Sequence, residues 1–436
     1  MVLFVMILGN YLGFSLDFPN ISRRDIIPVY TTLYFFLVFT FIVHKIAHIG
    51  QNFNVKNPLT VPICILLFYS IATILVYPTA YHIIVWFLLI LNMGIYYFII
   101  HVIDDEGFHR RLMWCWVVGG NILTILVMIS ILVHPQIIFY SKLLNGLDFA
   151  FIYAPDVEIR GYAIGHPNHT VLLLNLAFSV ILGLYIYETN RAKRMYLLLS
   201  LGFCLFANFL TMSKAGIGSL WAMVHFFILF SSKLRKHIFR NVVLFNTIVV
   251  MIFVAAYFFT DQLSPRILKT DEKGGYETSL GSRLEIWNAG LTALKQRKLV
   301  PFGLGVGGFD LYTEFPHAHS LYFSFFFDFG IVGIICIILI VLIFFREFFL
   351  KELRGGMLWS QKTYLETMSL AFLGGLVAIA IHGTVDHTYI KDILWVFWGF
   401  AIATLSLSRI EKKKAGDMNA GCDQVALTLR EGEKKC

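Results

Sequence analysis

Apolar positions along the chain form long runs that short polar connections separate. Most runs reach the roughly 17–25 residues that an α-helix needs to cross a bilayer. They predict about twelve membrane-spanning helices, at residues 2–16, 26–43, 59–77, 79–103, 112–133, 170–187, 195–212, 215–230, 241–259, 320–345, 365–382 and 389–408. The first run, MVLFVMILGN, has no basic region and no small-residue cleavage site, so it is interpreted as a retained span. The expected fold is an all-α polytopic membrane protein.

Two connections are much longer than the others, at residues 134–169 and 260–319. The second contains an amphipathic stretch, 282–296, with apolar residues at helical spacing. Residues 1–410 are therefore expected to form a single transmembrane domain. The remaining residues, 411–436, form a polar tail that is expected to be disordered.

Composition and charge agree with this interpretation. Hydrophobic residues make up 58% of the chain and charged residues 14%, against about a quarter charged in soluble domains. The net charge of +8 does not indicate a nucleic-acid partner, because most Lys and Arg lie in every second connection between spans, all on the same predicted side of the membrane. Positive charge of this kind marks the cytoplasmic side. Both termini and the tail are thus predicted to be cytoplasmic and both long loops to face outward.

With that orientation, the ionisable residues near span ends gather on the outer side. Polar groups at a membrane are costly and are usually kept for function. The sequence therefore predicts a functional site at the outer face. The residues concerned are Arg160, His166, His169, Lys214, Arg283, His317, His319, His382, Asp386 and His387.

Two of these histidines form a His-x-His motif directly before an apolar run. Histidine is the commonest general base, although His317 and His319 are equally compatible with capping the span that begins at Ser320. Asp386 follows another histidine in HGTVDH. It is compatible with orienting an imidazole, as a carboxylate does in a catalytic triad, or with balancing Lys391.

Three further residues suggest recognition of an anion at this face. Arg283 has the guanidinium fork that binds phosphate oxygens, and Trp287 follows it by one helical turn. Lys214 lies in the short outer turn TMSKAG, where its ammonium would point at an anionic headgroup. The plainer alternatives are a solvated arginine, an interfacial tryptophan and a lysine that snorkels to the surface.

No cofactor and no metal are expected. The GLGVGG segment has no strand before it and no acidic residue at the required distance after it, so it predicts a turn rather than a dinucleotide site. The outer histidines match no HExxH spacing, and no Cys or Glu completes a ligand set. The six cysteines show no CxxC pattern.

Taken in order, TMSKAG, LGSRLEIW, GLGVGGF, HAHSL and HGTVDH resemble the O-antigen ligase family, which shares its signature with O-antigen polymerases. Two positions depart from the family pattern. Lys214 stands where the family usually has Arg, and Ser320 stands where Asn usually follows the key histidine. His319, directly before Ser-Leu, matches that histidine better than His317 does.

The resemblance implies a metal-independent, inverting glycosyltransferase at the outer face of a bacterial inner membrane. Its donor would be a polyprenyl-diphosphate-linked glycan, held among membrane lipids. His319 would be the general base, while Arg283 and Lys214 would neutralise the diphosphate. Arg160, His317, Asp386 and Trp287 would bind substrate or support these residues.

Several functions stay open at this point. A ligase would transfer the glycan to a lipid A-core acceptor, a polymerase would lengthen the lipid-linked glycan, and a third possibility is a protein oligosaccharyltransferase. The ligase is favoured because the extended outer loop ends in the His-x-His motif. A transporter or flippase is the main alternative outside enzymes. It is disfavoured because transporters place polar binding residues near the midplane of the bilayer.

Overall fold

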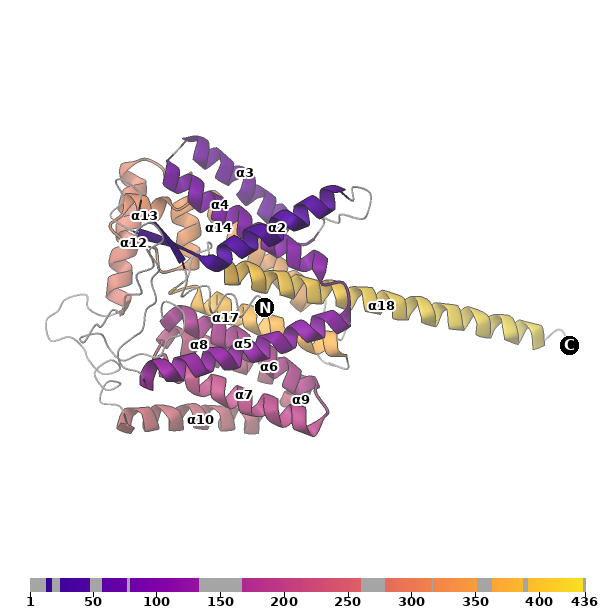
Figure 1. The fold of residues 1–436 in the computed structure, drawn as a ribbon. Helices are drawn as coiled ribbons and strands as arrows, with labels where there is room; N and C mark the ends of the chain where they lie inside the picture. The colour runs from indigo at the N-terminus through magenta and orange to yellow at the C-terminus, as the bar shows by residue number, and fades with distance from the viewer. Residues whose placement is uncertain are drawn as a thin grey trace.

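Helices dominate a computed structural model of the protein, which describes residues 13–17, 24–47, 57–76, 79–132, 167–259, 279–315, 317–350, 363–386 and 391–433 (Figure 1). The main helices are α2 (Val29–Ala47), α3 (Thr60–Val76), α4 (Ala80–Val102), α5 (Glu106–Leu132), α6 (Pro167–Tyr187), α7 (Arg191–Leu210), α8 (Lys214–Phe230), α10 (Ile238–Phe259), α12 (Ser279–Gln296), α14 (Leu321–Phe344), α17 (Tyr364–His382) and α18 (Asp392–Glu433). Two short helices, α9 (Ser232–Arg235) and α13 (Gly308–Tyr312), and a π-helical turn, η1 (Phe345–Leu350), complete the described helical elements.

Eleven of the twelve expected spans coincide with a described helix. Within the described residues, seven helices are long and apolar enough to cross a membrane, namely α4, α5, α6, α7, α14, α17 and α18. Shorter apolar helices occur in α2, α3, α8 and α10. The structure therefore supports a multi-pass membrane protein, while the number of twelve spans is not confirmed.

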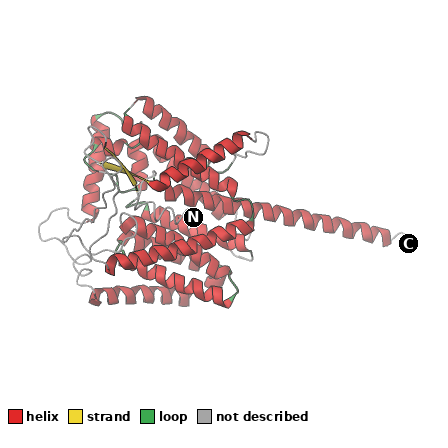
Figure 2. Cartoon of the chain, viewed as in Figure 1, coloured by secondary structure: helices red, strands yellow, loops and turns green. Residues whose placement is uncertain are grey.

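The first expected span is wrong where the structure describes it. Residues Gly13–Asp17 form strand β1, which pairs antiparallel with β2 (Arg24–Pro28), with Ser15 opposite Ile26 (Figure 2). Phe14 and Leu16 alternate with Ser15 and Asp17, the two-residue period of a strand. The apolar run is thus interrupted too early for a span. Apart from this short hairpin, the secondary-structure elements of the described residues are helical, in agreement with the expected all-α fold class. Residues 1–12 lie outside the described part.

The polar tail is also helical where it is described. Helix α18 continues past residue 410 to Glu433 and extends away from the body, as the yellow ribbon in Figure 1 shows. This contradicts the expectation of disorder. Fourteen of the 23 residues in 411–433 are Ala, Leu, Arg, Met, Lys, Gln or Glu, which have high helix propensity, and the segment contains no proline.

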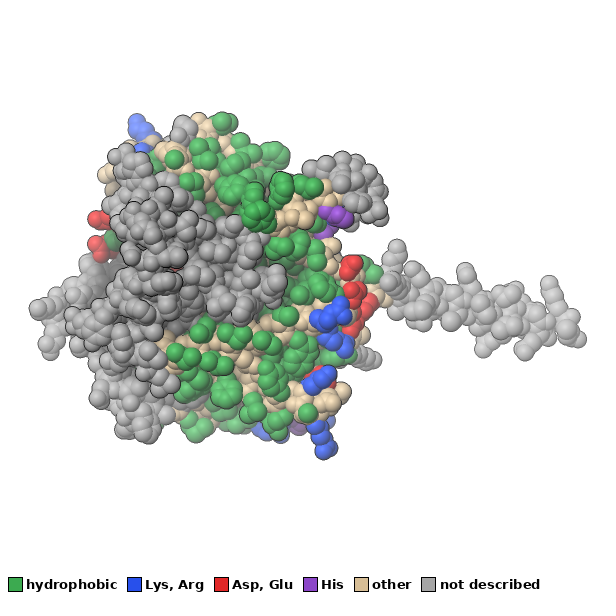
Figure 3. Space-filling view, in the orientation of Figure 1, with side chains coloured by type: hydrophobic (Ala, Val, Ile, Leu, Met, Phe, Trp, Pro, Cys, Tyr) green, Lys and Arg blue, Asp and Glu red, His purple; other side chains and the backbone are tan. Residues whose placement is uncertain are grey.

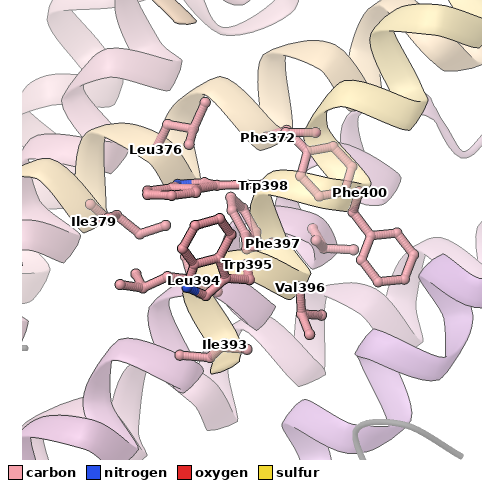
Figure 4. Packing of buried hydrophobic residues seen from close by; sticks show 14 of the residues in the cluster. Phe372, Leu376, Ile379, Ile393, Leu394, Trp395, Val396, Phe397, Trp398 and Phe400 are labelled. Carbon is pink, nitrogen blue, oxygen red and sulfur yellow. The ribbon is translucent and has the colours of Figure 1, made fainter. Parts of the chain in front are cut away.

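The core lies between α6, α17 and the first half of α18. Phe372, Leu376 and Ile379 of α17 lie beside Trp395 and Trp398 of α18 (Figure 4). Small residues let these helices approach closely, because their backbones can then pack without intervening side chains. A Cβ on Gly183 of α6 would meet Ala371, and one on Gly375 of α17 would meet Phe397. This packing fixes the position of the C-terminal end of α17.

Hydrophobic side chains cover much of the visible face of the bundle, and charged ones gather near the start of the extended part of α18 (Figure 3). Phe68 and Leu75 of α3 and Phe239 of α10 are among the exposed large apolar residues. Such exposure fits a surface that lipid covers. Arg110 lies near the start of α5 and Arg194 in the first turn of α7, at the helix ends opposite His319 and Asp386.

Candidate functional site

The start of α14 and the end of α17 are joined by direct hydrogen bonds. The Leu321 N–H donates to the carbonyl of Gly383 at 2.8 Å, and the Ser320 hydroxyl donates to the same oxygen at 3.2 Å. The Tyr322 hydroxyl donates to the carbonyl of Ala380 at 2.9 Å. Ser320 also caps α14 by accepting from the Phe323 N–H. These bonds bring the His-x-His motif next to the HGTVD turn, two segments far apart in the sequence.

His319 and Asp386 face each other across this junction. Nδ1 of His319 lies 3.8 Å from Oδ1 of Asp386, and their side chains are 25% and 11% exposed. The separation exceeds a hydrogen bond but is within the range of an ion pair with a protonated imidazole. The Asp386 N–H donates to the carbonyl of His382 at 3.1 Å, which continues the helical turn. A carboxylate is therefore held beside one ring nitrogen of a partly exposed histidine.

His319 has a left-handed backbone, with φ of 47°. For a residue with a Cβ this conformation costs about 1–2 kcal/mol, so its neighbours must hold it. On one side, the buried Ala318 carbonyl accepts a 2.8 Å hydrogen bond from Nε1 of Trp287. The Trp287 indole stacks on Phe323, with ring centroids 4.4 Å apart. The rings of His317 and His319 lie 4.0 Å apart, so α12 and α14 together fix the whole motif.

Arg283 brings a cation to the same carboxylate. It lies near the start of α12 and is half-buried. Burial lowers the pKa of its guanidinium, and the nearby Asp386 carboxylate offsets part of that lowering. Desolvation disfavours the charged form of an isolated cation. An anionic ligand at this point would therefore be stabilised by Arg283 and would in turn stabilise its charge.

Lys214 begins α8 at the same end of the bundle and is exposed. The TMSKAG turn before it is fixed by its own hydroxyl groups, which explains the Thr-x-Ser pattern. Thr211 Oγ1 accepts from the Ser213 N–H, and the Ser213 hydroxyl donates to Oδ1 of Asn168 on α6 at 2.7 Å. Helix α8 packs antiparallel on α17, where Gly374 lies against Phe227. Lys214 thus emerges at the end of α17 that carries Asp386.

The Gly-rich turn has a structural role that the sequence did not reveal. Its backbone N–H groups are directed at Asp328, a buried residue of α14. Asp328 accepts from Phe309 at 2.9 Å and from Gly307 at 3.2 Å. Gly303, Gly305 and Gly307 all have positive φ, which glycine tolerates without strain. The turn is therefore a docking element for α14, and its only signal in the sequence was a lone Asp in an apolar run.

Helix α14 breaks where this turn docks. Gly330 has φ 59° and ψ −141°, outside the helical range. A Cβ on Gly333 would lie 2.0 Å from the carbonyl oxygen of Phe325, although eight residues of straight helix span about 12 Å. The chain therefore bends sharply at Gly330. The Ile331 N–H donates to the carbonyl of Pro301 at 3.1 Å, which fixes the loop against the bend.

One of the seven residues with a predicted role, Arg160, lies outside the described part of the chain. His166 and His387, from the larger group expected at the outer side, lie outside it as well. His319, Asp386 and Arg283 come together, and His317 and Trp287 adjoin them. Lys214 lies at the same end of the bundle, on a neighbouring helix. Across the described residues, no group of three or more His, Cys, Asp or Glu side chains is arranged to hold a metal ion.

Residues 198–338 match the family model described as O-antigen ligase. The matched stretch runs from α7 into α14 and includes Lys214, Arg283, Trp287, His317 and His319. The resemblance to the O-antigen ligase and polymerase family is thus confirmed over this part of the chain. Asp386, which faces His319 in space, lies beyond the match. A search of curated proteins finds no match to the chain.

Proposed function

We propose that the protein is an O-antigen ligase, which transfers a glycan from a polyprenyl-diphosphate carrier to lipid A-core at the periplasmic face of a bacterial inner membrane. The observation that carries this proposal is the convergence of His319, Asp386 and Arg283 at one end of the bundle. A base, a carboxylate and a phosphate-binding cation are the groups that glycosyl transfer from a diphosphate requires.

His319 acts as the general base. Because Nδ1 faces Asp386, Nε2 is the ring nitrogen that meets the acceptor hydroxyl. Nε2 takes the proton as the acceptor oxygen forms a bond to the anomeric carbon of the donor. Asp386 stabilises the resulting imidazolium, and the 3.8 Å separation shortens as the positive charge forms.

Arg283 and Lys214 stabilise the leaving group. The bond between the anomeric carbon and the diphosphate oxygen breaks, and its electron pair leaves with the diphosphate. Cations that are already in place where negative charge develops lower the barrier, often as the largest single contribution. Attack opposite the leaving diphosphate inverts the anomeric configuration. The ester itself is the activated donor, so the reaction needs no nucleotide at this face.

The long apolar surface fits a donor with a polyprenyl tail. A reacting head at the helix ends and a lipid tail along the bundle keep the carrier in the membrane throughout. We place the site on the outer side because Lys and Arg are concentrated at the opposite helix ends, and such residues are enriched on the cytoplasmic side of membrane proteins.

A reconstituted transfer assay tests the proposal. Purified protein in liposomes receives lipid-linked glycan and lipid A-core in the presence of a chelator, and products are resolved by mass. We expect glycan on the core at a rate that the chelator does not change. Lengthening of the lipid-linked glycan would instead identify a polymerase. Loss of the activity with chelator would contradict the metal-independent mechanism.

A further inference from the structure

A second group of cations lies on the outer side of the molecule, at the far end of α12. Lys295, Arg297 and Lys298 are all exposed. The guanidinium of Arg297 lies over the ring of Tyr312, 3.9 Å from its centroid. Lys298 has a left-handed backbone, with φ of 55°, and its N–H donates to the carbonyl of Lys295 at 3.1 Å. We name these three residues the outer cation cluster. Positive charge is depleted on this side of most membrane proteins.

Directly after the cluster, the chain presents exposed apolar side chains. Val300 and Phe302 are 37% and 60% exposed. The segment is fixed in place, because the Tyr69 hydroxyl of α3 donates to the carbonyl of Phe302 at 2.7 Å. Phe68 and Leu75 of α3 are exposed as well. Cations therefore stand next to an apolar surface that continues along a span, the arrangement that an anionic lipid would match.

The helix dipole does not account for this arrangement by itself. Cations in the last turn of a helix interact favourably with its carbonyl end, which explains Lys295. Arg297 and Lys298 lie beyond that end, and neither the dipole nor capping requires exposed Phe302. Two acidic residues are close by in the chain, Asp310 and Glu314. The Asp310 carboxylate accepts from the Tyr81 hydroxyl at 2.9 Å.

We propose that the outer cation cluster docks the phosphate groups of a phosphorylated glycolipid acceptor, whose acyl chains lie against Phe302 and α3. This inference rests on the proposed function. Twelve residues of α12 separate Arg283 from Lys295, a rise of about 18 Å. The reacting hydroxyl is then several sugars away from the phosphates, as in an acceptor with an extended core. Lys and Arg stacked or held at a membrane surface are suited to phosphates.

The test measures acceptor kinetics in the same liposome assay. The variant K295Q/K298Q removes two charges and keeps Arg297 on Tyr312. Each cation near a membrane surface contributes a factor of about five in binding, so we expect KM for phosphorylated acceptor to rise roughly 25-fold, with kcat unchanged. With acceptor whose phosphates have been removed by phosphatase, wild type and variant should have the same KM. The control K193Q/K236Q removes two exposed cations at the opposite helix ends and should leave KM unchanged.

Three results would overturn the inference. One is an unchanged KM for the phosphorylated acceptor. Another is a rise in donor KM instead, which would assign the cluster to the diphosphate carrier. The third is an effect that disappears in liposomes without anionic phospholipid, which would assign it to bulk lipid.

A binding measurement separates this inference from the proposed function. Purified protein in neutral detergent is titrated with diphosphorylated glycolipid and, in parallel, with its dephosphorylated form. We expect a roughly 25-fold weaker Kd for K295Q/K298Q with the first ligand only. Phosphate-dependent binding without any glycan transfer would remove the ligase function and keep the docking site. Transfer to the core without phosphate-dependent binding would keep the ligase function and remove the docking site.

Discussion

Two histidines show how differently the two ends of the bundle use the same side chain. His109, on α5, is fully buried between α17 and α18. Its Nε2 lies 2.7 Å from the Thr404 hydroxyl and its Nδ1 2.9 Å from the Tyr364 hydroxyl. Because Thr404 donates its proton to the carbonyl of Phe400, Nε2 of His109 must be the donor and Nδ1 the acceptor. Both ring nitrogens are thus engaged in bonds that join three helices.

His319 differs in each of these respects. It is partly exposed, its Nδ1 faces a carboxylate at 3.8 Å rather than a hydroxyl at hydrogen-bond distance, and its backbone is left-handed. Strain of this kind persists only where neighbours enforce it, and it concentrates at functional sites. A neutral, fully bonded ring stabilises packing, whereas a ring beside a carboxylate at the surface can accept a proton.

Charged groups differ between the two ends of the bundle in the same way as the two histidines do. At the end of the bundle opposite His319, which we call the inner end, the buried Glu347 carboxylate of η1 forms ion pairs with Arg346 and with Arg409 of α18. Two cations thus surround one anion and join η1 to α18. At the other end, which carries His319 and which we call the outer end, Asp386 is close to both Arg283 and His319. There the carboxylate interacts with one permanent cation and with one group that gains charge only on protonation. The inner arrangement is complete without a ligand, and the outer one is suited to a change of charge.

The largest expected effect comes from removing His319. In H319A, transfer should fall by roughly 10²–10⁴-fold, the usual contribution of a general base, with the thermal unfolding midpoint unchanged. The measurement is kcat in liposomes beside the melting curve in detergent. As a control, H225A removes a histidine that bonds to the Trp221 carbonyl on α8, and it should retain transfer. Wild-type transfer by H319A would remove the catalytic assignment.

A smaller loss is expected when the Asp386 carboxylate becomes an amide. D386N keeps the shape of the side chain but can no longer stabilise an imidazolium, so kcat should fall by about 10²-fold. In the double variant with H319A, no further loss is expected, because the carboxylate acts through the ring. Additive losses would show that Asp386 acts on the substrate independently of His319. D105N, at the inner end, is the matched control.

The sequence predicts most of the helices because the length of an apolar run is a local property. It fails at the first span, where Ser15 and Asp17 turn an apolar run into an alternating pattern that pairs with β2. It also fails at the tail, where the helix propensity of 411–433 outweighs the polar composition. Both errors arise where overall composition indicates one structure and a local signal another, namely the polar alternation of Gly13–Asp17 in the first case and helix propensity in the second.

The sequence could predict which residues belong to the site but not how they are arranged in space. Arg283 and His319 are recognisable from the motifs, but the approach of Asp386 depends on the bonds between Ser320 and Gly383, which no local pattern encodes. The left-handed backbone of His319 depends on Trp287, 32 residues earlier in the chain. Asp328 was missed because its partners are backbone N–H groups, which leave no mark in a sequence.

The support that Trp287 gives to His319 can be tested without removing an aromatic ring. W287F keeps the stack on Phe323 and loses the Nε1 donor, which leaves the buried Ala318 carbonyl without that bond. A lost bond of this kind costs about 1 kcal/mol. We expect kcat to fall about fivefold with KM unchanged. W221F loses the equivalent bond to Asn246, far from the motif, and should keep its kcat. Equal effects of both variants would reduce Trp287 to a packing residue.

The smallest effect on catalysis is expected at His109. H109A leaves the hydroxyl of Tyr364 without its partner and creates a cavity where α5, α17 and α18 meet. The free energy of unfolding should fall by about 3 kcal/mol, seen as a lower melting midpoint in detergent. Transfer per folded molecule should stay within about twofold of wild type at a temperature below that midpoint. H319A should show the opposite pattern, with unchanged melting and lost transfer. If H109A instead abolished transfer in folded protein, the inner end would take part in the reaction and the division between the two histidines would fail.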